Sequence, residues 1–378
     1  MHIRSLTAIL LFTIGFTYSG SAQYGNDIYY SDTEIAGADS GSLFFRFGNA
    51  TFINNKEFFN PYQPGYTLTG YFIRPQLEYY PGTRTKLLAG MHLLHYSGQG
   101  KYHQAIPVFT FHHRFSRGLQ MVAGSLYGTL NHDLIEPLFA FDRVFTHHNE
   151  SGLQFLVDND FLEADVWLNW EKFIFTGSPF REEFIAGFSS KVLTGSSEGR
   201  FRVALPLQLL ATHKGGQIDA SGERLQTLVN FAAGVVMDWH VEGEVIEMVG
   251  FRGYMTGFKD LSKEFQYPYE NGWGIYPNIF VKGRWLEGGV GYWRGNQFVA
   301  PRGEPLFQSV SPVNPDIAAD HRELLTSKII FNRNLLRGIN MGVRFEVYYD
   351  LPAGQFDHSG GLHIVVDERF FITKPEER

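Results

Sequence analysis

Apolar and polar residues alternate with a period of two along most of the chain. From Leu162 to Glu171, one set of alternate positions reads Leu, Ala, Val, Leu and Trp, and the other reads Glu, Asp, Trp, Asn and Glu. Side chains that alternate in this way point to opposite faces of a β-strand. The same alternation runs through residues 200–209, 339–348 and 71–80, and helical spacing explains none of these segments. The sequence therefore predicts an all-β fold.

The alternating segments have the length of membrane-spanning strands. They run for about ten to thirteen residues, which is nearer the 9–11 of a membrane strand than the 5–6 of a soluble one. Their apolar faces are unbroken, whereas the opposite faces carry charges of both signs. We place sixteen strands, at 42–53, 66–80, 85–97, 105–116, 118–130, 151–158, 161–175, 182–194, 200–212, 224–238, 241–253, 270–281, 284–295, 322–334, 338–350 and 360–372.

Short and long links alternate between the predicted strands. The long links are 54–65, 131–150, 213–223, 254–269 and 296–321, and most of the links between them are much shorter. Short turns on one rim and long loops on the other are typical of a transmembrane antiparallel up-and-down β-barrel of the outer membrane. An even strand count places both termini on the side of the short turns, which predicts that both are periplasmic.

The first residues have the pattern of a secretory signal peptide. Arg4 precedes an apolar stretch from Leu6 to Phe16, and the small residues Gly20 and Ala22 suit a cleavage site. We therefore expect a cleaved signal peptide (1–22), a periplasmic N-terminal segment (23–41), a transmembrane barrel (42–372) and a C-terminal tail (373–378).

With these features the chain resembles the porin-type outer-membrane β-barrels of Gram-negative bacteria. The resemblance is one of pattern, extends from about Ser42 to Ile372, and includes no motif of a named member. It implies an outer-membrane location and passive diffusion of small polar solutes. The chain departs from the pattern at its end, because six residues follow Ile372 where such barrels often end in an aromatic residue.

Composition narrows the partners and the chemistry. The chain has no Cys, which excludes disulfides, zinc–thiolate sites and a thiol nucleophile. Its net charge is −7 without a basic face, so nucleic acid is not an expected partner. Aromatic residues make up 16% of the chain and 41 residues are Gly, which suits strands joined by tight turns. The expected partners are outer-membrane lipids, small polar solutes, and either further copies of the chain or other envelope proteins.

If the apolar faces meet lipid, the opposite faces line the lumen. Their charged and titratable residues can set the ion selectivity of a pore, or can pair across strands and stiffen the wall. The predicted pore-lining residues are Arg74, Glu78, His92, His112, Arg114, Glu163, Asp165, Glu171, Lys191, Arg200, Arg202, Arg344, Glu346 and Asp350. The long link 296–321 either folds inward and narrows the pore or lies outward and binds a partner.

We tested the sequence for catalytic and metal motifs. Residues 357–359 read Asp-His-Ser, but neighbouring residues of a strand face opposite ways, so His358 and Ser359 would not meet as base and nucleophile. The loop residues His132, His147 and His148 lack the spacing of a metal motif. We therefore expect no catalytic residue, no metal and no cofactor, and predict that the protein is not an enzyme.

Three functions remain as hypotheses. The leading one is a porin-like channel for passive diffusion of small polar solutes. The alternative is a non-transporting barrel that acts as a structural or interaction component of an envelope complex, with its lumen closed by ion pairs and inward loops. The third is a barrel that hydrolyses lipids.

Overall fold

The computed structural model describes residues 22–23, 25–194, 199–243 and 245–374. Apart from Ala22, the predicted signal peptide lies outside the described residues, as does the end of the C-terminal tail from residue 375. None of the described helices is long or apolar enough to cross a bilayer.

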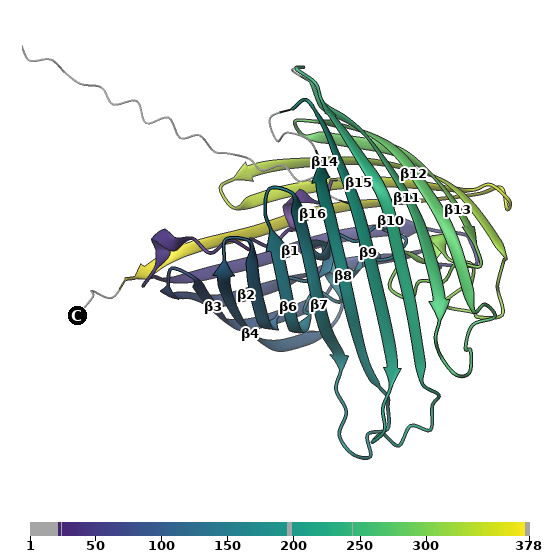
Figure 1. Cartoon of the computed structure of the whole chain (residues 1–378), viewed down its shortest axis with the longest axis horizontal. Helices are drawn as coiled ribbons and strands as arrows, with labels where there is room; N and C mark the ends of the chain where they lie inside the picture. Colours follow the sequence, from purple (N-terminus) through teal and green to yellow (C-terminus); the bar gives the residue numbers. More distant parts are fainter. Residues whose placement is uncertain (1–21, 24, 195–198, 244, 375–378) are drawn as a thin grey trace, which may run out of the picture.

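Sixteen antiparallel strands close into one barrel, as the sequence predicts (Figure 1). Each strand pairs with its neighbours in the chain, and β1 pairs with β16 to close the sheet. The strands are β1 (Leu43–Glu57), β2 (Tyr66–Gly82), β3 (Thr85–Tyr96), β4 (Gln104–Ser116), β5 (Leu119–Ser125), β6 (Ser151–Asp158), β7 (Leu162–Lys172), β8 (Glu182–Thr194), β9 (Phe201–Gly215), β10 (Gln226–His240), β11 (Ile246–Asp260), β12 (Asn271–Gly283), β13 (Leu286–Asn296), β14 (His321–Leu336), β15 (Ile339–Asp350) and β16 (Gln355–Thr373). Short helices lie between them or before them: η1 (Asp27–Tyr29), η2 (Gly37–Asp39), η3 (Thr129–His132), α1 (Arg143–Thr146) and η4 (Pro305–Phe307).

The period of two separates the two faces of the barrel wall. On β9, Leu205, Leu207 and Leu209 point outward and are 47%, 48% and 42% exposed, whereas the inward Gln208 and Leu210 are each 1% exposed. An exposed row of large apolar side chains around a closed sheet is the surface that lipid covers. The chain is therefore a porin-type transmembrane barrel.

The two ends of the barrel differ in their connections. We call one end the turn rim. It carries the short connections, such as residues 83–84, 117–118 and 284–285, together with the start of β1 and the end of β16. We call the other end the loop rim; it carries all the longer connections, which are 58–65, 97–103, 126–150, 173–181, 216–225, 261–270 and 297–320, together with the short link 351–354. In Figure 1, β16 ends at the left, on the turn rim, and the long loops gather at the lower right.

Two of the long loops fold into the barrel and fill it. Phe298, Phe307 and Leu138 pack against inward residues of β10 to β15, including Trp293. Residues of 126–150 pack against the inward faces of β1 to β3 in one cluster and of β5 and β7 to β9 in another. Because these clusters reach most of the circumference, the hydrophobic core lies inside the barrel. The polar lumen that we expected is therefore found only in part, and the long link 296–321 takes the inward alternative.

Part of the segment 23–41, which we expected to be periplasmic, lies inside the barrel: Gln23 and residues 25–31 contact the inner loop or the wall. The Gln23 side chain donates hydrogen bonds to the carbonyls of Leu134 and Phe139 at 3.0 Å. Asn26 is fully buried and accepts a hydrogen bond from Arg344 on β15 at 2.7 Å. These contacts, one set on an inner loop and one on the wall, hold the segment in the interior.

The strand boundaries differ from prediction where the chain turns inward. Strand β5 ends at Ser125 rather than near residue 130, because the apolar residues that follow, such as Leu126 and Leu130, join the interior clusters. Strand β11 continues to Asp260 rather than ending near 253. Its glycines hid the alternation: Gly257 faces outward under the ring of Phe231, which occupies the place of a side chain.

Candidate functional site

Charged residues inside the barrel are joined to one another in a network of ion pairs. Lys328 lies 3.0 Å from Glu346 on the neighbouring strand and 2.5 Å from Glu136 on the inner loop. Glu346 also pairs with Arg344 at 2.5 Å and accepts a hydrogen bond from Tyr348 at 3.0 Å. Buried charges are tolerated when each is paired and hydrogen-bonded, so this cluster links the inner loop to the wall.

The predicted pore-lining residues are distributed as follows. Ion pairs inside the barrel or at its loop rim hold seven of them: Glu163, Asp165, Glu171, Lys191, Arg344, Glu346 and Asp350. Glu78 is paired with Arg46, and interior aromatic or polar side chains surround Arg74, His92 and His112. Two further arginines, Arg114 and Arg202, take inward positions near the turn rim, whereas Arg200 lies outside the wall, in a turn.

Arg200 is the residue that the strand pattern misplaced. Its side chain is 67% exposed and pairs with Glu242 of the next turn at 2.5 Å. The strand begins one residue later, at Phe201, so the alternation that we extended through Arg200 does not fix the direction of its side chain. That residue thus lies at the turn rim and does not line the interior.

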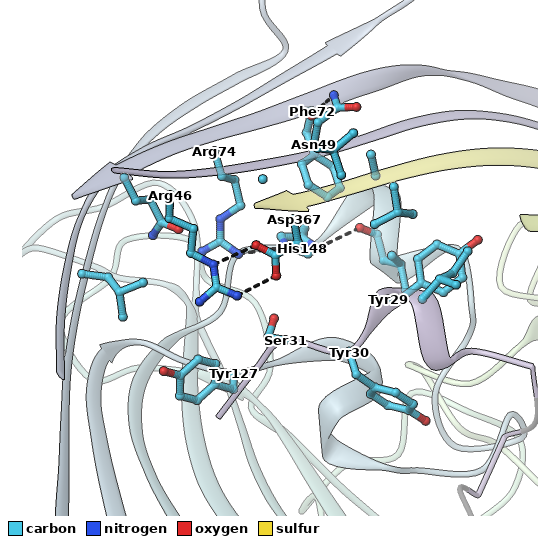
Figure 2. A pocket seen from close by; sticks show the side chains of 18 of the residues that line it. Tyr29, Tyr30, Ser31, Arg46, Asn49, Phe72, Arg74, Tyr127, His148 and Asp367 are labelled. Atoms are coloured by element: carbon cyan, nitrogen blue, oxygen red, sulfur yellow. Dashed lines mark hydrogen bonds and ion pairs between the residues drawn. The ribbon is translucent and has the colours of Figure 1, made fainter. Parts of the chain in front are cut away.

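One interior cavity is lined by two arginines (Figure 2). Figure 2 shows Arg46 facing Asp367, to which it donates two hydrogen bonds at 2.8 and 2.6 Å, with Arg74 and His148 beside them. The cavity has a volume of about 90 Å³, and the N-terminal segment covers it with Tyr29, Tyr30 and Ser31. A space of this size holds a few water molecules.

His148 is held neutral in this cavity. Burial lowers the pKa of His148 well below its usual range, and the positive charge of Arg74 adds to the effect. The Nδ1 atom of His148 lies 3.2 Å from the carbonyl of Val144, and Nε2 lies 2.9 Å from Arg74. A neutral ring that donates through Nδ1 and accepts through Nε2 satisfies both contacts.

His132 is held in the opposite charge state. Its ring nitrogens lie 2.7 Å from Asp165 and 2.9 Å from Glu150, and its ring stacks on Trp167 at 3.7 Å. Burial alone would lower the pKa of His132, but the two carboxylates outweigh it and raise the pKa to about 9. Because both nitrogens already bind carboxylates, this histidine has no free ring nitrogen for a metal.

A larger interior cavity lies toward the turn rim. It has a volume of about 300 Å³ and is lined by Glu163, Lys191 and Asp133, among others. Lys191 pairs with Asp133 at 2.6 Å and with Glu163 at 3.4 Å. Tyr127 and Leu156, which belong to one of the interior apolar clusters, also line this cavity.

The residues of the Asp-His-Ser stretch do face apart. Ser359 points into the barrel, where it is 3% exposed and donates a hydrogen bond to Glu346 at 3.3 Å. His358 points to the lipid-facing side, next to Phe345 and Phe356. The two therefore cannot act together as nucleophile and base.

A hydroxyl and an imidazole do meet on the lipid-facing wall at the loop rim. His213 on β9 and Thr227 on β10 are direct cross-strand partners, and His213 Nδ1 lies 2.8 Å from Thr227 Oγ1. Phe184 stacks on His213 at 4.8 Å, and Trp170 packs on Phe184 at 5.5 Å. A polar pair thus lies in a row of aromatic side chains on the lipid-facing wall.

A second pair of the same type lies at the opposite rim. Thr85 on β3 faces His113 on β4, with Thr85 Oγ1 at 2.9 Å from His113 Nδ1. It also lies among aromatic residues, because Phe111 and Phe115 pack on His113. The two pairs are alike in chemistry and differ in the rim that they occupy.

A third polar group faces lipid near His358. Thr67 donates a hydrogen bond to Asn55 at 2.6 Å, and Asn55 donates one to Glu57 at 2.8 Å. Glu57 is the cross-strand partner of His358. In this group the hydroxyl is bonded to an amide oxygen rather than to a base, unlike the hydroxyl of Thr227, which contacts His213 directly.

These features define a porin-type outer-membrane β-barrel with a filled lumen. Among solved structures, the chain is similar to OccAB4 of Acinetobacter baumannii, with 10% identity, 87% of this chain and 98% of that chain covered, and a TM-score of 0.47. It is similar to OprD of Pseudomonas aeruginosa, with 10% identity, 91% and 97% covered, and a TM-score of 0.48. It is also similar to a BenF-like porin of Pseudomonas fluorescens Pf-5, with 9% identity, 87% and 99% covered, and a TM-score of 0.45.

The chain belongs to the lipid A 3'-O-deacylase-type family, whose model matches residues 35–375. A search of curated proteins finds no match. The family is named for an enzyme, and this overturns our expectation that the protein is not one. The expectation rested on residues adjacent in sequence, whereas strand register also brings hydroxyl and imidazole groups together, as it does at Thr227 and His213.

Sequence reasoning also missed the groups that the inner segments supply. His132, Glu136 and Glu304 come from loops, and each pairs with a residue of the wall. A signal was present: residues 126–150 hold many more Leu, Ile and Phe residues than a solvated loop needs. That composition indicates a segment that is buried.

Proposed function

We propose that the protein is an outer-membrane lipid hydrolase that removes an ester-linked acyl chain from lipid A. Thr227 and His213 are the reacting pair. The observation that carries the proposal is the 2.8 Å contact between Thr227 Oγ1 and His213 Nδ1 on the lipid-facing wall, in a chain of a deacylase-type family. A base within hydrogen-bond reach of a hydroxyl is the arrangement that activates a nucleophile.

The filled lumen supports chemistry on the outer wall. A passive channel needs a continuous water-filled path, and the apolar clusters around residues 126–150 and 297–320 occupy that path. A lipid substrate reaches the protein from the side and needs no such path. The closed lumen therefore disfavours the porin-like channel for small polar solutes and leaves the wall accessible to lipid.

The rim on which the pair lies matches the location of lipid A. Short turns of outer-membrane barrels face the periplasm and long loops face the exterior, which supports an orientation with both termini in the periplasm and the loop rim at the outer leaflet. Lipid A resides in the outer leaflet. Thr227 follows the connection 216–225 of the loop rim, so its hydroxyl stands at the depth of the lipid A headgroup.

The reaction follows from the geometry of the pair. His213 accepts the proton of the Thr227 hydroxyl while Thr227 Oγ1 attacks the ester carbonyl carbon. The ester C–O bond breaks, and the sugar oxygen leaves with the proton from His213. Water then attacks the carbonyl carbon of the acyl–threonine ester while His213 accepts a proton from it. The acyl–Oγ1 bond breaks, Thr227 Oγ1 takes that proton back from His213, and a free fatty acid departs. Trp170 and Phe184 extend the apolar row beside the pair, where an acyl chain can pack.

Variants of the two matched pairs test the proposal. We expect Thr227→Val and His213→Phe each to lower fatty-acid release from lipid A by at least about 100-fold, because each removes one half of the acid–base pair. The measurement is mass spectrometry of lipid A after incubation with the purified full chain in mixed vesicles.

Thr85→Val and His113→Phe are the matched controls, since they remove the same chemistry from the turn rim. Release by these variants should equal that of the wild type, and Thr227→Ser should retain activity. Undiminished release by Thr227→Val would exclude Thr227 as the nucleophile.

A further inference from the structure

A second lipid-facing feature lies at the turn rim, away from the proposed reacting pair. A groove of about 920 Å³ runs along the outer wall between β11 and β14. Its walls are apolar and include Val249, Ile279, Val281 and Ile329. Of these strands, β11, β12 and β13 are the green ones at the right of Figure 1.

The groove exists because one outward position of the wall has no side chain. Gly288 on β13 is flanked by Val281 on β12 and by Ile329 on β14, which are its cross-strand partners. A Cβ atom at Gly288 would meet only the carbonyl of Lys328, at 3.4 Å. The wall therefore has room for a larger residue at this position, and glycine leaves that room as a notch.

Two arginines stand at the mouth of the groove. The guanidinium carbon of Arg284 lies 5.2 Å from the ring centre of Trp285, and that of Arg333 lies 5.3 Å from the same ring. Neither arginine forms an ion pair with any carboxylate among the residues that the structure describes. Two unneutralised charges thus converge on one aromatic ring at the membrane surface.

We propose that this groove binds one glycerophospholipid of the periplasmic leaflet. Its phosphate lies between Arg284 and Arg333, and an acyl chain fills the notch at Gly288. Arginine is suited to phosphate because its guanidinium donates several hydrogen bonds in a plane. From Leu286 to Val290 the groove extends roughly 13 Å along the strand, close to half of the ~30 Å hydrocarbon thickness. A lipid of one leaflet therefore matches the groove in charge and in length.

Native mass spectrometry tests this site on the full chain exchanged from phosphatidylglycerol vesicles into detergent. The wild type should retain one phosphatidylglycerol per barrel. The double variant Arg284→Gln with Arg333→Gln should retain it at least about tenfold less, because both phosphate contacts are lost. Gly288→Leu should lower retention as strongly, since its side chain fills the notch while both arginines remain.

Arg337→Gln is the matched control, because Arg337 lies on the same rim but pairs with Glu368 of β16 and does not line the groove. It should retain lipid as the wild type does. All variants should keep the heat-modifiable migration of a folded barrel. Equal retention by the wild type and the double arginine variant would overturn the proposal, as would unchanged retention by Gly288→Leu. Neither result bears on hydrolysis at Thr227, so the two proposals fail separately.

Discussion

At the residue scale, the direction of a side chain decides its chemistry more than its place in the sequence. His358 and Ser359 are neighbours in the chain and are separated by the barrel wall. His213 and Thr227 are 14 positions apart and touch, because strand pairing sets them side by side. Candidate catalytic pairs in such a barrel are therefore to be sought across strands and on one face.

His132 gives a pH-dependent stability at the same scale. Its pKa of about 9 in the folded chain lies above the usual 6.5. A raised pKa stabilises the fold fully below the unfolded value, and this stabilisation is lost as the pH rises through 9. We expect the free energy of unfolding to fall by up to about 3 kcal/mol between pH 6 and pH 10, measured from urea unfolding midpoints.

The His132→Gln variant should be less stable than the wild type at pH 6 and should show little change between pH 7 and pH 10. His103→Gln, in an exposed loop, serves as the control and should follow the wild type. A wild-type stability that rises over this range would show that His132 is not charged in the folded chain.

At the scale of elements, the two inner loops close the barrel. Residues 297–320 supply Phe298 and Phe307, which surround Trp293 of the wall at 5.1 and 5.4 Å between ring centres. Burial of such aromatic residues is a strong stabilising contribution. The loop is thus part of the core, and it blocks the cross-section of the barrel.

Removing this loop should open the lumen. If residues 297–320 are replaced by a short Gly-Ser link, we expect stable unitary conductance steps in planar bilayers, because the apolar cluster around Trp293 loses its central members. The wild type should show none. Stable steps of the wild type as large as those of the variant would contradict a closed barrel.

The sequence predicts the wall well and the interior poorly. Alternation is a local property that locates the sixteen strands, and the pattern of short and long links predicts their antiparallel order. The inward course of residues 126–150 and 23–41 depends on contacts with strands far away in the chain, such as Gln23 with Leu134 or Asn26 with Arg344. No local pattern encodes such contacts. The pair Thr227–His213 was hidden for the same reason, because it depends on register.

At the scale of the whole molecule, the barrel is a filled scaffold whose lipid-facing wall carries two distinct features. The loop rim holds the Thr227–His213 pair in an aromatic row. The turn rim holds an apolar groove with Arg284 and Arg333 at its mouth. Both are reached from the bilayer rather than through the lumen, which suits the membrane lipid that we propose as the substrate.

The central claim is that this closed barrel hydrolyses lipid A from the side. The most direct measurement is the mass of lipid A recovered from outer membranes that contain the wild-type chain, compared with membranes that contain the Thr227→Val variant at equal abundance. The account predicts that the wild type yields lipid A lighter by one ester-linked acyl chain, and that the variant yields the unshortened molecule. Lipid A of unchanged mass in the presence of the wild type would contradict it.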